Sequence, residues 1–310
     1  MLVSVSLSLT LLISVCGLPS PPYECIFGYS TGHVGTTTLS RPSSYLPTSS
    51  TVFLFEGHRI ASSIRAASST VSYRKYTALN FTVQHELEFI LYHALPFYQR
   101  AVNESHAEVV MDLGHANLFY YRGIAEAVKR RAQGFCTHVT FVRIRRARYE
   151  SAKSLMYTTP GRLRHNLCTD VLYGYCPFHN IPAVVLNPPN RSVWQKFTVF
   201  QQALWLIDET EARWRQLVCK YSSVEDISFV SLYWSSKIPG SLERSIERVA
   251  RLIQGSPNHG TAKRTQVHSN NTPQGSDNSV QQDMAYREAM GYSETPFIIE
   301  DSELFSSVRS

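Results

Sequence analysis

Residues 25–40 read Cys-Ile-Phe-Gly-Tyr-Ser-Thr-Gly-His-Val-Gly-Thr-Thr-Thr-Leu-Ser, and this stretch decides the fold that we predict. Its first residues are apolar and suit a buried strand. A loop rich in glycine follows, and glycine lets the backbone turn tightly and approach a ligand closely. The free N–H groups at the start of the next helix can then hold an anion, aided by the helix dipole. A surface turn rich in glycine and threonine would have the same composition.

We interpret this stretch as a phosphate-binding loop, although it departs from the regular Walker A motif. That motif needs Gly-Lys followed by Ser or Thr, and Thr36 stands where the lysine should be. The hydroxyl groups of Thr36 and Thr37 would supply neutral donors to phosphate oxygens.

Apolar segments alternate with helix-periodic segments along most of the chain. The segments that suit strands are 25–27, 51–55, 107–111, 136–142 and 227–234. The segments with helical spacing are 83–98, 118–131, 194–217 and 239–252, with a shorter one after residue 143. This alternation predicts an α/β fold, with a parallel central sheet of about five strands flanked by helices. Within 83–98, we expect Pro96 to kink or end the helix.

The two ends of the chain differ in composition from its middle. Residues 1–20 combine an apolar core with small residues and prolines, which is typical of a signal peptide; a short membrane anchor is the alternative. We expect the α/β domain to span 21–254. Residues 255–310 are polar and predict a mostly disordered tail that adds little to the core, with a short helix at 281–290 that docks back.

The net charge of +6 over 310 residues fits an anionic ligand or an acidic polymer, and we expect no nucleic-acid partner. A secretory route agrees with four N-glycosylation sequons, which begin at Asn80, Asn103, Asn190 and Asn270. A membrane contact is expected only if the N-terminal segment stays uncleaved.

Cys16 falls in the signal segment, so an odd number of cysteines remains for the mature chain. Cys168 and Cys176 flank a predicted loop and are the favoured disulfide pair. Cys25 and Cys136 lie in predicted strands, where buried thiols are favoured. No spacing suggests zinc, and we expect no metal.

Polar residues follow the ends of four predicted strands. They are the loop at 28–37, Glu56 with His58, Asp112 with His115, and the run 143–151. In open α/β sheets, ligands bind beyond the carboxyl ends of the strands. These positions therefore predict a ligand-binding site, although each group could also consist of surface or strand-end residues that bind no ligand. For Arg145 and Arg146, a solvated surface is the favoured interpretation.

The run Arg-Ile-Arg-Arg-Ala-Arg-Tyr-Glu-Ser at 143–151 resembles the second nucleotide-binding motif of the sulfotransferases, Arg-x-Pro-x-x-Arg-x-x-Ser. Arg145 stands in place of the usual proline. The resemblance implies that Arg143 and Ser151 hold the 3′-phosphate of the donor, 3′-phosphoadenosine 5′-phosphosulfate (PAPS).

The loop after the first strand resembles the first motif of the same family, in which Lys or Arg, one residue and Gly-Thr-Thr cradle the 5′-phosphosulfate. The residues that correspond here are His33, Val34, Gly35, Thr36, Thr37 and Thr38. His33 stands at the Lys or Arg position. The run Asp-Glu-Thr-Glu-Ala-Arg-Trp at 208–214 also resembles helix sequences of some members.

The resemblance implies a P-loop-type α/β fold that moves a sulfuryl group from PAPS to a hydroxyl acceptor without a metal. We expect a glycan acceptor, with tyrosine and lipid acceptors as alternatives, and a location in the Golgi lumen or outside the cell. The acceptor needs a general base, which the family takes from a His after the third strand or a Glu after the second. We rank His115 first, Glu56 second and His58 third; Leu113 replaces the lysine of the family's Lys-Thr-His strand end.

Two other functions fit parts of the pattern. In a lumenal P-loop kinase, Asp112 would end a Walker B strand and Mg²⁺ would be needed, but the P-loop lysine is missing. A secreted, non-catalytic descendant that binds anionic sugars would explain the departures at His33 and Arg145.

We expect His33 to make activity pH-dependent if it replaces the phosphate-binding cation. Activity should fall as pH rises through the pKa of His33 in the complex, which the bound anion should raise above about 6.5. The His33→Lys variant should keep activity and lose this alkaline limb, whereas His33→Ala should lose most turnover. An inactive lysine variant, or one with the wild-type pH profile, would contradict this role.

Overall fold

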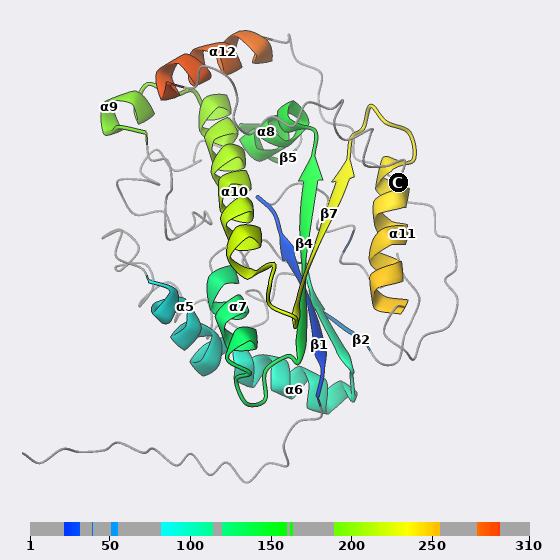
Figure 1. The fold of residues 1–310 in the computed structure, drawn as a ribbon. Helices are drawn as coiled ribbons and strands as arrows, with labels where there is room; N and C mark the ends of the chain where they lie inside the picture. Colours follow the sequence, from blue (N-terminus) through cyan, green and yellow to red (C-terminus); the bar gives the residue numbers. More distant parts are fainter. Residues whose placement is uncertain are drawn as a thin grey trace, which may run out of the picture.

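A parallel sheet of five strands forms the centre of the protein (Figure 1). The structure is a computed structural model, and it describes residues 22–31, 39, 51–54, 82–113, 120–159, 162–163, 189–254 and 278–291. The strands of the sheet are β1 (Glu24–Tyr29), β2 (Thr51–Leu54), β3 (Val109–Asp112), β4 (His138–Arg146) and β7 (Ile227–Trp234). Their order across the sheet is β2-β3-β1-β4-β7, so β1 is central. The predicted parallel α/β fold is confirmed.

The central strand β1 is buried on both faces because helices cover both sides of the sheet. Phe27 and Tyr29 point into one apolar cluster, and Ile26 points into a second cluster on the other face. A Cβ atom on Gly28 would lie 2.6 Å from the Cα atom of Leu113, so only glycine fits there. This glycine therefore belongs to the strand and serves packing between β1 and the end of β3.

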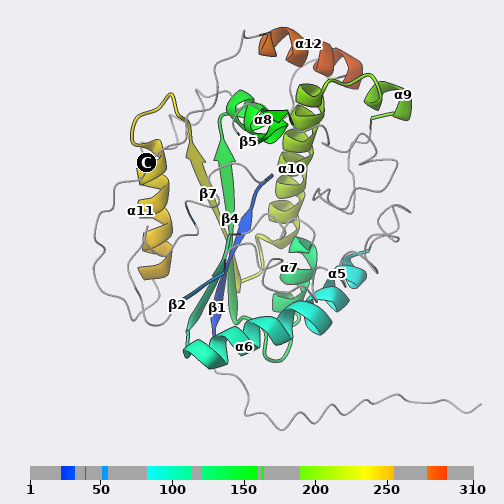
Figure 2. The same ribbon diagram turned by 180° about the vertical axis from the view of Figure 1, so that it is seen from behind.

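The helices on the two faces of the sheet pack into two different apolar clusters. One face of the sheet is covered by α5 (Val83–Phe89), the π-helical segment η3 (Ile90–Ala94), α6 (Leu95–Ser105), α7 (Tyr121–Lys129) and α10 (Val199–Tyr221). The helix α11 (Ser241–Gln254) covers the other face. Figure 2 shows the sheet and the helices on its two faces from behind. The shorter elements are α8 (Arg148–Met156), β5 (Tyr157–Thr159), β6 (Arg162–Leu163) and α9 (Arg191–Trp194).

The helical segment that contains Pro96 continues past the proline to Ser105. Pro96 lies in the first turn of α6, directly after the π-helical turn η3. In a first turn the missing N–H group of proline costs no hydrogen bond. The proline therefore does not end the helix, and the irregularity falls on the residues before it.

A disulfide joins Cys25 in β1 to Cys136 just before β4. We expected two buried thiols here, and that expectation is wrong. The strands β1 and β4 are hydrogen-bonded neighbours, and this brings the two Cα atoms to 5.8 Å, within disulfide range. Cys168 and Cys176, the pair favoured from sequence, lie outside the described residues.

The helix expected at 281–290 is α12 (Ser279–Met290), and it packs against α10 near the carboxyl edge of the sheet. Tyr286 is fully buried and donates a hydrogen bond to Asp208 at 3.0 Å. Asp283 is 1% exposed and accepts hydrogen bonds from Arg148 and Tyr149. This part of the tail therefore contributes to the core, contrary to expectation.

Within the described part of the chain, no helix is long and apolar enough to cross a membrane. Residues 1–20, which we interpret as a signal peptide, lie outside the described residues, as do 255–277 and 292–310 of the tail.

We expect Asp283→Asn to lower the free energy of unfolding by about 3 kcal/mol, because it leaves buried Arg148 with a weaker partner. Urea denaturation of the full chain would measure the change. Glu288→Gln on the exposed side of the same helix is the control, and should change stability by less than about 0.5 kcal/mol. Equal effects of the two substitutions would show that the docking of α12 does not depend on this charge.

Candidate functional site

The crevice between β1 and β4 is where the sheet topology places a ligand. The chain leaves β1 toward β2 on one side of the sheet and leaves β4 toward β7 on the other. Connections that diverge in this way leave a crevice at the carboxyl ends of the two strands. The register pairs Tyr29, the last residue of β1, with Arg143 of β4. The glycine-rich loop and Arg143 therefore start from the same edge.

Arg143 is held by three neighbours on the face of the sheet that α10 covers. Its Nη1 donates to Glu211 at 2.8 Å and its Nε to Ser231 at 3.0 Å. Its guanidinium carbon lies 5.3 Å from the centre of the Trp214 ring. Burial lowers the pKa of Arg143, and the carboxylate of Glu211 opposes that shift. Arg143 is thus a positioned cation whose charge an internal carboxylate neutralises.

Arg145 shares the same carboxylate, because residues two apart in a strand lie on one face. Its Nε lies 3.2 Å from Glu211, and its side chain is only 14% exposed. Its Nη1 is buried and has no hydrogen-bond partner among the described residues. The expectation of a solvated Arg145 is wrong. Two guanidinium groups therefore face one carboxylate, which leaves an excess of positive charge.

Arg146 lies on the opposite face of the sheet. It forms an ion pair with Glu150 at 2.9 Å, and its guanidinium group stacks on the Trp234 ring at 4.4 Å. Its side chain is 6% exposed, so the expectation of a solvated residue is wrong here too. Arg146 is therefore separated from Arg143 by the sheet, and its contacts join β4 to α8 and β7.

The predicted partner Ser151 lies on α8, which begins two residues after β4 ends. Ser151 is buried, and its hydroxyl donates to the carbonyl oxygen of Arg146 at 3.4 Å. The start of α8 is fixed by Arg148, which binds Asp208 and Asp283 at 2.7 Å each. Although burial disfavours the charged form, these two carboxylates raise the pKa of Arg148.

The other predicted site residues lie outside the described residues. They are His33, Val34, Gly35, Thr36, Thr37, Thr38, Glu56, His58 and His115. The strands that lead to them are described, and their register aligns Leu54 of β2, Asp112 of β3 and Phe27 of β1. The carboxyl ends of these strands therefore lie at one edge of the sheet.

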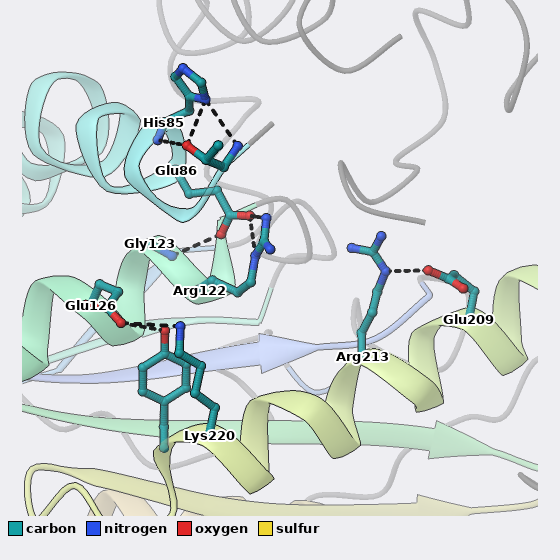
Figure 3. Close-up of polar contacts among 10 residues, drawn as sticks. His85, Glu86, Arg122, Gly123, Glu126, Glu209, Arg213 and Lys220 are labelled. Carbon is teal, nitrogen blue, oxygen red and sulfur yellow. Dashed lines mark hydrogen bonds and ion pairs between the residues drawn. The ribbon is translucent and has the colours of Figure 1, made fainter. Parts of the chain in front are cut away.

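Sequence reasoning missed a buried ion pair within α10. The Nε of Arg213 donates to Glu209 at 2.8 Å, and the two side chains are 2% and 0% exposed. In Figure 3 the side chain of Arg213 points away from α10, toward the region of Glu86 and Arg122. The Nη2 of Arg213 is buried without a hydrogen-bond partner among the described residues. The signal was available in the sequence, since three acidic residues between 208 and 211 directly follow the apolar run at 203–207.

These buried cations fit an anionic ligand. A buried polar atom without a partner is costly, so Nη1 of Arg145 and Nη2 of Arg213 each suit a bound oxygen atom. Across the described ranges, no group of three or more His, Cys, Asp or Glu side chains could hold a metal ion.

Compared with known proteins, the chain matches no family model, no curated protein and no solved structure.

We expect Glu211→Gln to make the protein less stable and more responsive to anions. Arg143 and Arg145 lose their carboxylate, which should cost about 2 kcal/mol and lower the Tm at low ionic strength. Inorganic sulfate should raise the Tm of this variant more than that of the wild type, because it replaces the missing charge.

The matched control is Glu150→Gln, which removes the carboxylate of Arg146 on the other face of the sheet. Sulfate also stabilises proteins without binding them. Equal Tm shifts for the two variants would therefore contradict an anion site at Arg143.

Proposed function

We propose that the protein is a sulfotransferase that moves a sulfuryl group from PAPS to a hydroxyl group, with a glycan as the acceptor. The observation that supports this most is the pairing of Tyr29 with Arg143 at the carboxyl ends of neighbouring strands. The strand that precedes 33–38 in the chain thus ends beside the strand in which 143–151 begins. The buried cations of the crevice between β1 and β4 favour an anionic ligand with more than one charged group.

In this proposal, Arg143 and Ser151 hold the 3′-phosphate, and residues 33–38 hold the phosphosulfate. His115 or Glu56, with His58 as the third candidate, accepts the proton of the acceptor hydroxyl. The reaction forms a bond between the acceptor oxygen and sulfur, and breaks the bond between sulfur and the bridging phosphate oxygen. The leaving product is adenosine 3′,5′-bisphosphate, and positioned cations offset the charge on its phosphate. No metal is needed.

We further propose that the protein works in the secretory pathway, in the Golgi lumen or outside the cell. The disulfide between Cys25 and Cys136 favours an oxidising compartment. Asn103 and Asn190, the sequon residues within the described chain, are both exposed and would be accessible to glycosylation.

A non-catalytic protein that binds anionic sugars is the second candidate, and one observation favours it. Glu211 already occupies the guanidinium group of Arg143. A ligand phosphate must share or displace this carboxylate, which weakens nucleotide binding relative to an unoccupied arginine.

We expect Arg143→Ala to weaken the binding of adenosine 3′,5′-bisphosphate at least about tenfold, because it removes a charged hydrogen bond to phosphate. Isothermal titration calorimetry would measure this. Arg146→Ala is the control, since Arg146 faces the other side of the sheet, and it should change the affinity little. Equal losses in both variants would indicate a diffuse basic surface.

The deciding experiment is transfer of labelled sulfate from PAPS to a panel of glycans and peptides. Transfer by the wild type that is lost in Arg143→Ala supports the sulfotransferase. Binding of anionic sugars without nucleotide binding or transfer would favour the second candidate.

A further inference from the structure

Arg213 has the properties of a ligand-binding residue that the two motifs do not include. It is 1% exposed, yet it keeps one N–H group, Nη2, without a partner among the described residues. Glu209 accepts a hydrogen bond from Nε of the guanidinium group. The large majority of buried donors in proteins have an acceptor, so an unpaired one requires an explanation. The unpaired donor of Arg213 therefore calls for an oxygen atom that the described residues do not supply.

The position of Arg213 is the carboxyl end of β1. The hydroxyl of Tyr29, the last residue of β1, donates to the carbonyl oxygen of Thr210, one turn before Arg213. The ring of Tyr29 also packs against Trp214 and Tyr121 at 5.2 and 5.4 Å. Burial raises the pKa of Tyr29, and the charge of Arg213 opposes this rise, as expected for close neighbours. Arg213 thus lies beside the point where the glycine-rich loop begins.

Arg143 and Arg213 are both associated with one aromatic residue, Trp214. The guanidinium group of Arg143 lies over the Trp214 ring, and Arg213 precedes Trp214 in α10. Two cations at one strand edge suit a ligand with an anionic group at each end. The donor of the proposed reaction is such a ligand, with a 3′-phosphate and a 5′-phosphosulfate.

We propose that Nη2 of Arg213 binds the sulfuryl end of the donor and supplies a permanent positive charge there. This inference rests on the proposed function. It would explain how the site tolerates His33, since arginine stays protonated at every physiological pH. Glu209 holds the guanidinium group in place through Nε, so that Nη2 can donate to the ligand.

The test compares two nucleotides that differ only in the sulfuryl group. Calorimetry on the full chain would measure Kd for PAPS and for adenosine 3′,5′-bisphosphate. In the neutral double variant Glu209→Gln/Arg213→Gln, the affinity for PAPS should fall about tenfold or more relative to that for the bisphosphate. The preference should fall equally at pH 6 and pH 9, roughly the range over which histidine loses its charge.

The matched control is Arg146→Gln/Glu150→Gln, which removes the other buried pair with four-residue spacing. It should leave the preference for PAPS unchanged. If the neutral Arg213 variant fails to fold, Arg213→Lys provides the test. Glu209 then binds the single ammonium group, and the same loss of preference is expected.

Each outcome separates the two proposals. If the wild type binds both nucleotides and the Arg213 variants keep its preference, the role of Arg213 is refuted while the proposed function stands. A loss confined to high pH would assign the preference to His33 and also refute it. If the wild type binds neither nucleotide, the proposed function fails, and the role of Arg213 fails with it.

Discussion

Burying a guanidinium group costs several kcal/mol unless a carboxylate lies beside it, and this requirement fixes how α10 packs on the sheet. Glu211 of α10 meets Arg143 and Arg145 of β4, and Asp208 meets Arg148 at the start of α8. A shift of α10 by one residue would separate these pairs and bury unpaired charges.

The same pairing shapes what the crevice can bind. Where each cation already has a carboxylate, the free energy of binding is only the difference between the ligand's contacts with the cation and the contacts that the ligand displaces. Weakly charged molecules then gain little, whereas a ligand with several anionic oxygens can use the buried donors that remain. Such a site gives up affinity and gains selectivity for highly charged ligands. A binding protein and an enzyme would both benefit, which is why both functions are kept as proposals.

Most of the fold could be predicted from local patterns, and most of the site could not. The strand Ile227–Trp234 was predicted at its observed bounds, because a continuous apolar run identifies a buried parallel strand. The disulfide was missed because β1 and β4 become neighbours only through the strand order, which no spacing between Cys25 and Cys136 reveals. Arg145 and Arg146 were misjudged because a charged run resembles a solvated surface unless its partners, 66 and four residues further along the chain, are known. The positions of His33, Glu56 and His115 remain predictions.

The docking of α12 also has a consequence for biosynthesis. Arg148 leaves the ribosome 135 residues before Asp283, and Tyr286 follows later still. Domains form from the N-terminus as the chain emerges, so the sheet strands are available before α12 exists. Until α12 has been translated, Arg148 can pair with Asp208 but not with Asp283, and the surface that Tyr286 later covers stays open to chaperones. Premature termination between β7 and α12 would therefore release a chain with all five sheet strands but without the helix that covers this end of α10.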